Sequence, residues 1–238
     1  MKKLIIKKNN ENIYAIIYNL EKWDKNNIII ACHGFDSKKD GGTIKKLSSS
    51  INALIISFDF PAHGESNQEL SLKKSIEYLK EIINYTKNNY DGKISLFGSS
   101  FGAYVILQLL NSNDINYENI FLKSAAINMD KILKDILIEE DIKEYEKKGY
   151  TIKNRNKKMI IPYKFYQELC NNKVNKTSFI NRNIYLFHGT SDDTAPYEDI
   201  LKYELPNVHI IELQGANHSF NEEEMEEMTN HIKKTLSI

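Results

Sequence analysis

The chain is 238 residues long, and its 32 lysines and arginines balance 32 aspartates and glutamates, giving a formal net charge of zero. This length allows one substantial hydrophobic core, and no glycine-rich, proline-rich or charged stretch marks a linker, so the sequence predicts a single domain over residues 1–238. The balanced charge argues against nucleic acid or an anionic membrane as a partner. No apolar run has the length of a signal-peptide core or of a membrane helix, which needs about 20 residues.

The cysteine content favours a reducing compartment. Cys32 and Cys170 are the only two cysteines in the chain. A domain of this size folds without disulfide staples, and a disulfide framework would need more cysteines than these. The sequence therefore predicts a cytoplasmic location.

The chain opens with two short runs of β-strand character, Lys3–Lys7 and Asn12–Tyr18, separated by the turn-forming residues KNNEN. Wholly apolar strands then alternate with helices, and strands without polar alternation are typical of a parallel sheet covered on both faces. The predicted strands are Asn27–Ala31, Ala53–Phe58, Lys93–Phe97, Asn119–Lys123, Asn183–Phe187 and Val208–Leu213, and the predicted helices are Ser71–Lys87, Phe101–Leu110, Tyr197–Tyr203 and Glu222–Leu236. The predicted fold is a three-layer α/β sandwich whose sheet is mostly parallel, with antiparallel N-terminal strands.

One region interrupts this alternation. Residues 125–182 form a connection far longer than the few residues that usually join a strand to the next element, and helical patterns at Met129–Glu146 and Tyr163–Asn171 predict an ordered insertion. Two interpretations of its aromatic side chains remain open: they cover a pocket, or they bury the insertion against the sheet. These aromatic residues are Tyr145, Tyr150, Tyr163, Phe165, Tyr166 and Phe179.

Polar residues follow five of the predicted parallel strands. In an open parallel sheet, ligands bind at the carboxyl ends of the strands, so these segments are the candidates for a functional site. They are His33-Gly34-Phe35, the segment from Asp59 to Ser66, Gly98-Ser99-Ser100-Phe101-Gly102, the segment from His188 to Asp193, and Gly215-Ala216-Asn217-His218.

The segment GSSFG matches the pattern G-x-S-x-G between a buried strand and an apolar helix. In this pattern the central serine, here Ser100, lies on a strained turn with its hydroxyl exposed above the sheet. The flanking residues Gly98 and Gly102 are glycines because larger side chains would collide with the helix and the adjacent strand. The sequence thus predicts Ser100 as a nucleophile.

A serine hydroxyl needs a base to remove its proton, and the base needs a carboxylate to orient it. Asp192 and His218 follow Ser100 in the order expected on this kind of sheet, each just past a strand. Of the six histidines, only His218 lies in a loop after the last strand. His209 falls within a strand and His231 within a helix, and the remaining three, each before a glycine at a tight turn, are better explained as turn-stabilising residues: His33, His63 and His188.

The histidines do not suggest a metal centre. No pair has the helical i, i+4 spacing of metal ligands, and no cluster of cysteines and histidines is present. We therefore predict neither a metal nor another cofactor.

Taken together, these motifs resemble the α/β-hydrolase family over nearly the whole chain, with the insertion at the position of that family's cap. The turns HGF, FDFPAHGES and HGTSDD are similar to those of the cinnamoyl/feruloyl esterase and monoacylglycerol lipase-like branch. The resemblance implies Ser100 as nucleophile, His218 as base and Asp192 as acid, with an oxyanion hole formed by the backbone N–H groups of Phe35 and Phe101. Ser99 departs from the histidine or tyrosine common before the nucleophile, and Ala195 replaces a larger aliphatic residue.

The choice between adjacent carboxylates also rests on this resemblance. The turn HGTSDDTAP resembles the family pattern H-G-x-x-D-x-x-[apolar]-P, which makes Asp192 the acid. The alternative, that Asp193 is the acid and Asp192 stabilises the turn, remains open.

The predicted function is hydrolysis of small-molecule carboxylic esters of small or aromatic acyl groups through an acyl-enzyme on Ser100. The insertion residues predicted to contact the substrate are Tyr163, Phe165 and Tyr166. A thioesterase or a small serine peptidase would use the same three residues. A noncatalytic binding module on the same fold is a further alternative, although it would not need all three.

Overall fold

The structure is a computed structural model and describes residues 1–23, 25–111, 117–154, 158–175, 182–202 and 208–238. Within these residues the chain forms an eight-stranded sheet in the order β1-β2-β4-β3-β5-β6-β9-β10 and a separate two-stranded sheet. The strands of the large sheet are β1 (Lys2–Lys8), β2 (Glu11–Tyr18), β3 (Asn27–Cys32), β4 (Leu54–Phe58), β5 (Lys93–Ser99), β6 (Ile120–Lys123), β9 (Ile184–Gly189) and β10 (Val208–Leu213).

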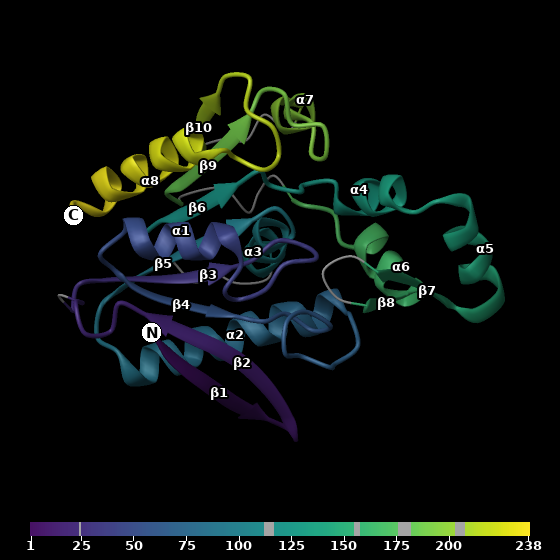
Figure 1. The fold of residues 1–238 in the computed structure, drawn as a ribbon, viewed down its shortest axis with the longest axis horizontal. Coiled ribbons are helices and arrows are strands. Elements are labelled where there is room, and N and C mark those ends of the chain that lie inside the picture. The colour runs from purple at the N-terminus through teal and green to yellow at the C-terminus, as the bar shows by residue number, and fades with distance from the viewer. Residues whose placement is uncertain (24, 112–116, 155–157, 176–181, 203–207) are drawn as a thin grey trace.

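In the order given above, all strands from β4 to β10 pair in parallel with their neighbours in the sheet. β1 and β2 form an antiparallel pair, and β2 joins the sheet antiparallel to β4. Helices cover both faces (Figure 1). The predicted α/β fold class, with a mostly parallel sheet and antiparallel N-terminal strands, is confirmed.

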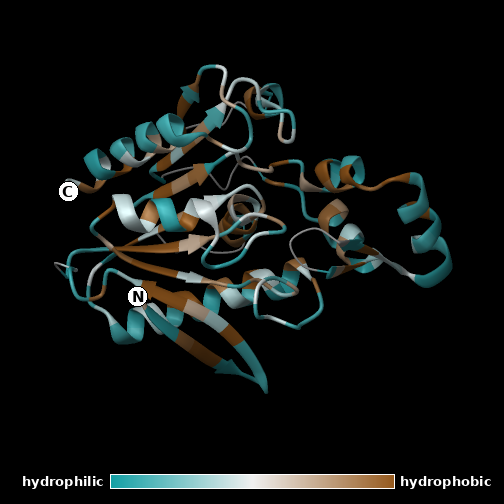
Figure 2. Ribbon diagram, viewed as in Figure 1, coloured by the Kyte–Doolittle hydropathy of each residue, from teal (hydrophilic) through white to brown (hydrophobic). Residues whose placement is uncertain are grey.

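The core has two halves because side chains of a strand alternate between the faces of the sheet. In β3, Ile28 and Ile30 join the half that is covered by α2 (Leu72–Asn89) and α3 (Phe101–Asn111). Ile29 and Ala31 join the opposite half. That half is covered by α1 (Gly42–Ser50) and α8 (Glu222–Leu236). The central strands are hydrophobic along their length, whereas α8 shows a hydrophilic outer face (Figure 2).

The insertion holds α4 (Met129–Ile136), α5 (Glu139–Lys148), β7 (Tyr150–Asn154), β8 (Lys158–Pro162) and α6 (Tyr163–Asn171). β7 and β8 pair as an antiparallel hairpin. These helices and strands lie beyond the carboxyl ends of the parallel strands (Figure 1). The helical patterns of the insertion were thus predicted, although the first divides into α4 and α5, and the hairpin was not predicted.

Two other differences concern short helices. α1 was not predicted from the sequence. Its residues, GTIKKLSSS, bury only Ile44 and Leu47, so the helical spacing of apolar residues is too weak to recognise. Near the C-terminus, α7 spans Tyr197–Leu201, whereas the predicted helix extends to Tyr203, which lies outside the described residues, as does Phe179. Among the described helices, none combines the length and apolar character needed to cross a lipid bilayer.

Candidate active site

The turn between β5 and α3 presents Ser100 above the sheet. Ser100 has a φ of 52°, which is a left-handed conformation that non-glycine residues rarely adopt. A Cβ atom at Gly98 would lie 2.7 Å from the backbone nitrogen of Ala103 in α3, and one at Gly102 would collide with the carbonyl oxygen of Cys32 in β3. The two glycines therefore allow strand and helix to approach closely enough to form this strained turn.

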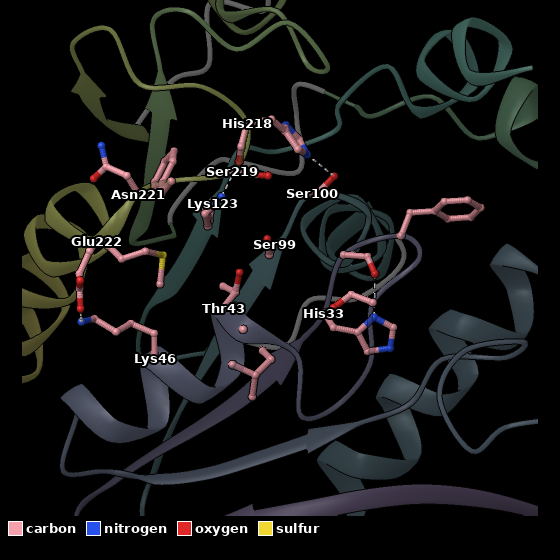
Figure 3. Close-up of a pocket in the computed structure, with 17 residues that line it drawn as sticks. His33, Thr43, Lys46, Ser99, Ser100, Lys123, His218, Ser219, Asn221 and Glu222 are labelled. Atoms are coloured by element: carbon pink, nitrogen blue, oxygen red, sulfur yellow. Dashed lines mark hydrogen bonds and ion pairs between the residues drawn. The ribbon is translucent and has the colours of Figure 1, made fainter. Parts of the chain in front are cut away.

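A continuous path of hydrogen bonds joins Ser100, His218 and Asp192. The Nε2 atom of His218 lies 2.9 Å from Ser100 Oγ (Figure 3). Its Nδ1 atom lies 2.9 Å from Oδ2 and 3.0 Å from Oδ1 of Asp192. An ionised carboxylate only accepts, so Nδ1–H donates to Asp192 and Nε2 accepts from the serine hydroxyl. The three residues come from loops after β5, β9 and β10, as the sequence order predicted.

Backbone hydrogen bonds hold the carboxylate of Asp192 in place independently of His218. Its side chain is buried, and Oδ1 accepts hydrogen bonds from the backbone N–H groups of Thr194 and Ala195, at 3.0 and 2.8 Å. Burial alone would raise the pKa of Asp192, but the hydrogen bonds from His218 and Ala195 outweigh it and hold this pKa below its usual value. Asp193 is exposed, and its Oδ1 accepts a hydrogen bond from the Thr194 hydroxyl instead. Of the two adjacent carboxylates, Asp192 is therefore the one that faces His218.

Two of the other histidines stabilise the turns that flank the site. His33 has its Nδ1 2.7 Å from the carbonyl oxygen of Gly34, and its Nε2 accepts from the N–H of Phe60 at 3.1 Å. Burial lowers the pKa of His33 to about 4, so its ring is neutral. His63 likewise has Nδ1 2.8 Å from the carbonyl oxygen of Pro61 and accepts at Nε2 from the N–H of Asp36. Their rings connect the loops after β3 and β4.

His188 lies beside the carboxylate of Asp192. Its ring is fully buried, with Nε2 2.7 Å from the carbonyl oxygen of Ala195 and 3.3 Å from Oδ2 of Asp192. Burial is the main cause that lowers the pKa of His188. The turn-stabilising role predicted for these three histidines therefore agrees with their hydrogen bonds.

The two predicted oxyanion donors belong to the loop after β3 and to the start of α3. Phe101 is the first residue of α3, and the first N–H groups of a helix have no partner within the helix. Phe35 follows β3, and its ring packs edge-on against Phe101 with centroids 5.7 Å apart. Phe101 thus follows Ser100 directly in the chain, and Phe35 lines the same cavity as Ser100.

Lys123, at the carboxyl end of β6, was not singled out from the sequence. Its side chain is 3% exposed, and Nζ donates to the carbonyl oxygen of His218 at 2.6 Å (Figure 3). The hydroxyl of Ser124 donates to the same oxygen at 3.0 Å. The end of β6 thus fixes the main chain that carries His218. The available signal was a lysine that closes an otherwise apolar strand, NIFLK.

Among the residues that the structure describes, Lys123 Nζ makes no ion pair. Besides the His218 carbonyl, Nζ donates to Ser124 Oγ at 3.2 Å and lies 3.9 Å from the centroid of the Phe220 ring. Burial lowers the pKa of Lys123 to about 8, although Asp192 and Glu224 act in the opposite direction. Lys123 is therefore a cation held by neutral groups.

Two cavities meet at Ser100 and His218. The α4 cavity, about 580 Å³, is lined on its apolar side by Met129, Ile132 and Ile136. The α1–α8 cavity, about 520 Å³, lies between the first turns of α1 and α8 (Figure 3). The insertion residues predicted to contact substrate line neither cavity as described: Tyr163, Phe165 and Tyr166.

These three aromatic side chains have different environments. Phe165 is 1% exposed and stacks on Phe35, with ring centroids 6.2 Å apart. The rings of Tyr163 and Tyr166 pack against each other with their centroids 6.0 Å apart. Both residues line a separate cavity within the insertion together with Tyr145. Phe165 thus reaches the site through Phe35, whereas the two tyrosines do not lie beside Ser100. Among the described residues, no three His, Cys, Asp or Glu side chains come together as a metal site.

A family model described as an alpha/beta hydrolase of unknown function, DUF900, matches residues 8–167, which is more than half of the chain. No match to a curated protein was found. A solved structure of Est1E from Butyrivibrio proteoclasticus with ferulic acid bound is similar at 15% identity and a TM-score of 0.82, with 99% of this chain and 100% of that chain covered.

Mouse alpha/beta hydrolase domain-containing protein 10 is similar at 18% identity and a TM-score of 0.75, with 100% and 99% of the two chains covered. The monoacylglycerol lipase of Paleococcus ferrophilus is similar at 18% identity and a TM-score of 0.68, with 94% and 98% covered. At these identities the likeness establishes the fold.

Proposed function

The chain belongs to this α/β-hydrolase family, and on that premise we propose that it hydrolyses carboxylic esters through an acyl-enzyme formed on Ser100. The observation that carries the proposal is the hydrogen-bonded path from Asp192 through His218 to Ser100. The ferulic acid bound to Est1E and the lipase among the relatives support an ester of a small or aromatic acyl group as the substrate class.

In the first half of the reaction, Nε2 of His218 accepts the proton of Ser100 as its oxygen attacks the ester carbonyl. Asp192 stabilises the resulting imidazolium and keeps the ring in the required tautomer. The N–H groups of Phe35 and Phe101 stabilise the oxyanion, and one such donor is worth about 2.7–4 kcal/mol in a comparable site. His218 then gives its proton to the leaving alcohol.

In the second half, a water molecule attacks the acyl-enzyme. His218 removes a proton from that water and gives it to Oγ of Ser100 as the second tetrahedral intermediate collapses, which releases the acid and restores free Ser100. Lys123 and Ser124, which both donate to the carbonyl oxygen of His218, would keep the imidazole in register through both halves. The scheme uses no cofactor.

We assign residues 125–182 the role of a cap within a single domain that spans residues 1–238. Phe165 would act on the site through Phe35, whereas Tyr163 and Tyr166, which line a separate cavity, would influence substrate choice only through the packing of the insertion. Cys32 and Cys170 are both free thiols, which supports the cytoplasm as the place of action.

The proposal is tested with a fluorophosphonate probe and a panel of activated esters, thioesters and aminoacyl amides. We expect covalent labelling of the wild-type protein on Ser100 and turnover that is fastest with the esters. Labelling that survives in Ser100→Ala would contradict the assignment. Faster turnover of the thioesters or amides would keep the nucleophile but change the reaction class.

A further inference from the structure

The α1–α8 cavity has a lining suited to a particular chemical group. It shares Ser100 and His218 with the α4 cavity, so an ester bound at Ser100 has one space on each side of its carbonyl carbon. The α4 cavity has an apolar wall made by Met129, Ile132 and Ile136 of α4. The carboxylates of Asp36 and Asp193 also line the α4 cavity, whereas the α1–α8 cavity, which has apolar residues such as Met225 as well, gathers hydroxyl groups, lysines and the start of a helix.

Ser99 supplies the first polar group of this cavity. The residue is 7% exposed and lies between Thr43 and Lys123 in the view of the cavity (Figure 3). Among the residues that the structure describes, its hydroxyl has no hydrogen-bond partner. Buried polar side chains are usually hydrogen-bonded, so the hydroxyl of this largely buried residue, which opens into the cavity, is available to a group that enters from outside the chain.

The first turn of α1 supplies further donors. Gly42, Thr43 and Ile44 all line the cavity. The N-cap residue is Gly41, which has no side chain that could accept a hydrogen bond from these N–H groups, and the first turn contains no acidic residue. The N–H groups of this turn therefore remain available, and the positive end of the helix dipole favours a negative charge beside them.

The charged side chains of the lining add to this preference. Lys46 and Lys123 are cationic, and Glu222 is the single carboxylate that faces them in the lining. Glu222 is 87% exposed at its side chain and lies 3.4 Å from Lys46, so this pair is at the solvent-facing mouth. The lining thus carries one net positive charge, and the contacts of Lys123 Nζ within the described part of the chain are with neutral groups.

From these observations we infer that the α1–α8 cavity binds an anionic group, a carboxylate or a phosphate, on one arm of the substrate, while the α4 cavity takes the other, uncharged arm. The inference rests on the proposed ester hydrolysis at Ser100 and narrows its substrate class. Ser99, the first turn of α1 and Lys46 form the recognition site.

The test compares matched esters in two series. In the acyl series, 4-nitrophenyl hydrogen glutarate is compared with 4-nitrophenyl pentanoate. In the alcohol series, the pentanoate esters of 4-(carboxymethyl)phenol and 4-(phosphonomethyl)phenol are compared with that of 4-methylphenol. We expect an anionic ester of one series to exceed its neutral partner in kcat/KM by about tenfold, as one charge-assisted hydrogen bond allows.

The variants Lys46→Met and Ser99→Ala should reduce this ratio of anionic to neutral turnover, Lys46→Met to near one. The matched control is Lys45→Met, which removes an exposed lysine of the same helix that does not line the cavity and should leave the ratio as in the wild type. No preference in either series, or the same preference in Lys46→Met as in Lys45→Met, would overturn the inference while leaving ester hydrolysis in place.

A binding measurement separates the inference from the proposed reaction. Glutarate and inorganic phosphate are titrated by calorimetry into Ser100→Ala and into the double variant with Lys46→Met. We expect one of them to bind Ser100→Ala and to bind the double variant about tenfold more weakly. Absence of binding to Ser100→Ala would overturn the inference even if every neutral ester were hydrolysed, and binding without any turnover would overturn only the proposed reaction.

Discussion

The loops at the carboxyl ends of the sheet and the insertion beside them are stabilised in different ways. In the loops, directional hydrogen bonds fix single atoms: Asp192 accepts from two backbone N–H groups, and the carbonyl of His218 accepts from Lys123 and Ser124. The insertion reaches the site through ring packing, as Phe165 stacks on Phe35. It also exposes apolar side chains such as Ile138 and Ile160.

This difference predicts two kinds of mutational effect. In the loops, a change of one atom alters a hydrogen bond or a protonation state, so the effect appears in the chemical step while the fold persists. In the insertion, a change alters packed volume, so it appears first in stability and then in the ratio between substrates. The following experiments test this division, beginning with the largest expected effect.

Ser100→Ala should lower kcat by about a millionfold, because the remaining groups of such a unit act only together with the nucleophile. The far-ultraviolet circular dichroism spectrum and the melting temperature should stay close to those of the wild type. Ester turnover and fluorophosphonate labelling measure the loss. If Ser100→Ala remained active and Ser99→Ala were dead, the nucleophile would be the other serine.

Asp192→Asn should lower kcat by about ten-thousandfold, because an amide facing Nδ1 favours the wrong tautomer of His218. The matched control is Asp193→Asn, which changes the adjacent exposed carboxylate and should stay within a few-fold of the wild type. Both variants are assayed on one activated ester. A severe loss in Asp193→Asn alone would reverse the assignment of the acid.

The sequence was sufficient to predict the strand-end residues of the site because each motif is local. The elbow GSSFG, the turn HGTSDD and the loop GANH each carry their own signal, and a parallel sheet brings strand ends together. Their meeting in space was therefore predictable from the order of strands.

Contacts between residues that lie far apart in the sequence could not be predicted from local motifs. Lys123 donates to a carbonyl 95 residues away, and nothing local to NIFLK indicates that partner. The free hydroxyl of Ser99 likewise acquires meaning only once α1, a short helix with two buried residues, lies beside it. Phe165 was predicted as a substrate contact, yet its position against Phe35 follows from tertiary packing.

In the insertion, Phe165→Ala should lower the free energy of unfolding by about 3–5 kcal/mol, the usual cost of emptying a fully buried phenylalanine site. The control is Tyr163→Ala, at a side chain that is 42% exposed, and it should cost far less. Urea denaturation measures both. The ratio of kcat/KM between short and aromatic acyl esters should shift in Phe165→Ala, because Phe35 loses its stacking partner. An unchanged ratio with lowered stability would restrict Phe165 to a packing role.

Lys123 is an exception to this division: it belongs to the hydrogen-bonded loops, yet replacing it should change the free energy of unfolding and its dependence on pH. Its pKa is about 8 in the folded protein because the side chain is buried, against an ordinary value near 10.5 in the unfolded chain. Between these two values the unfolded chain binds more protons than the folded one, so the free energy of unfolding rises with pH there. Relative to Lys123→Met, the wild type should therefore gain up to about 3 kcal/mol between pH 8 and pH 10.5.

The measurement is urea denaturation of both proteins at several pH values, with Lys93→Met, at an exposed lysine of β5, as the reference for removing one positive charge. The difference between wild type and Lys123→Met should climb across this pH window and level off above it. A difference that fell with rising pH would mean that the folded state favours the charged form of Lys123. In that case the hydrogen bonds to the His218 carbonyl and to Ser124 would outweigh burial, and Lys123 would stabilise the loop as a cation.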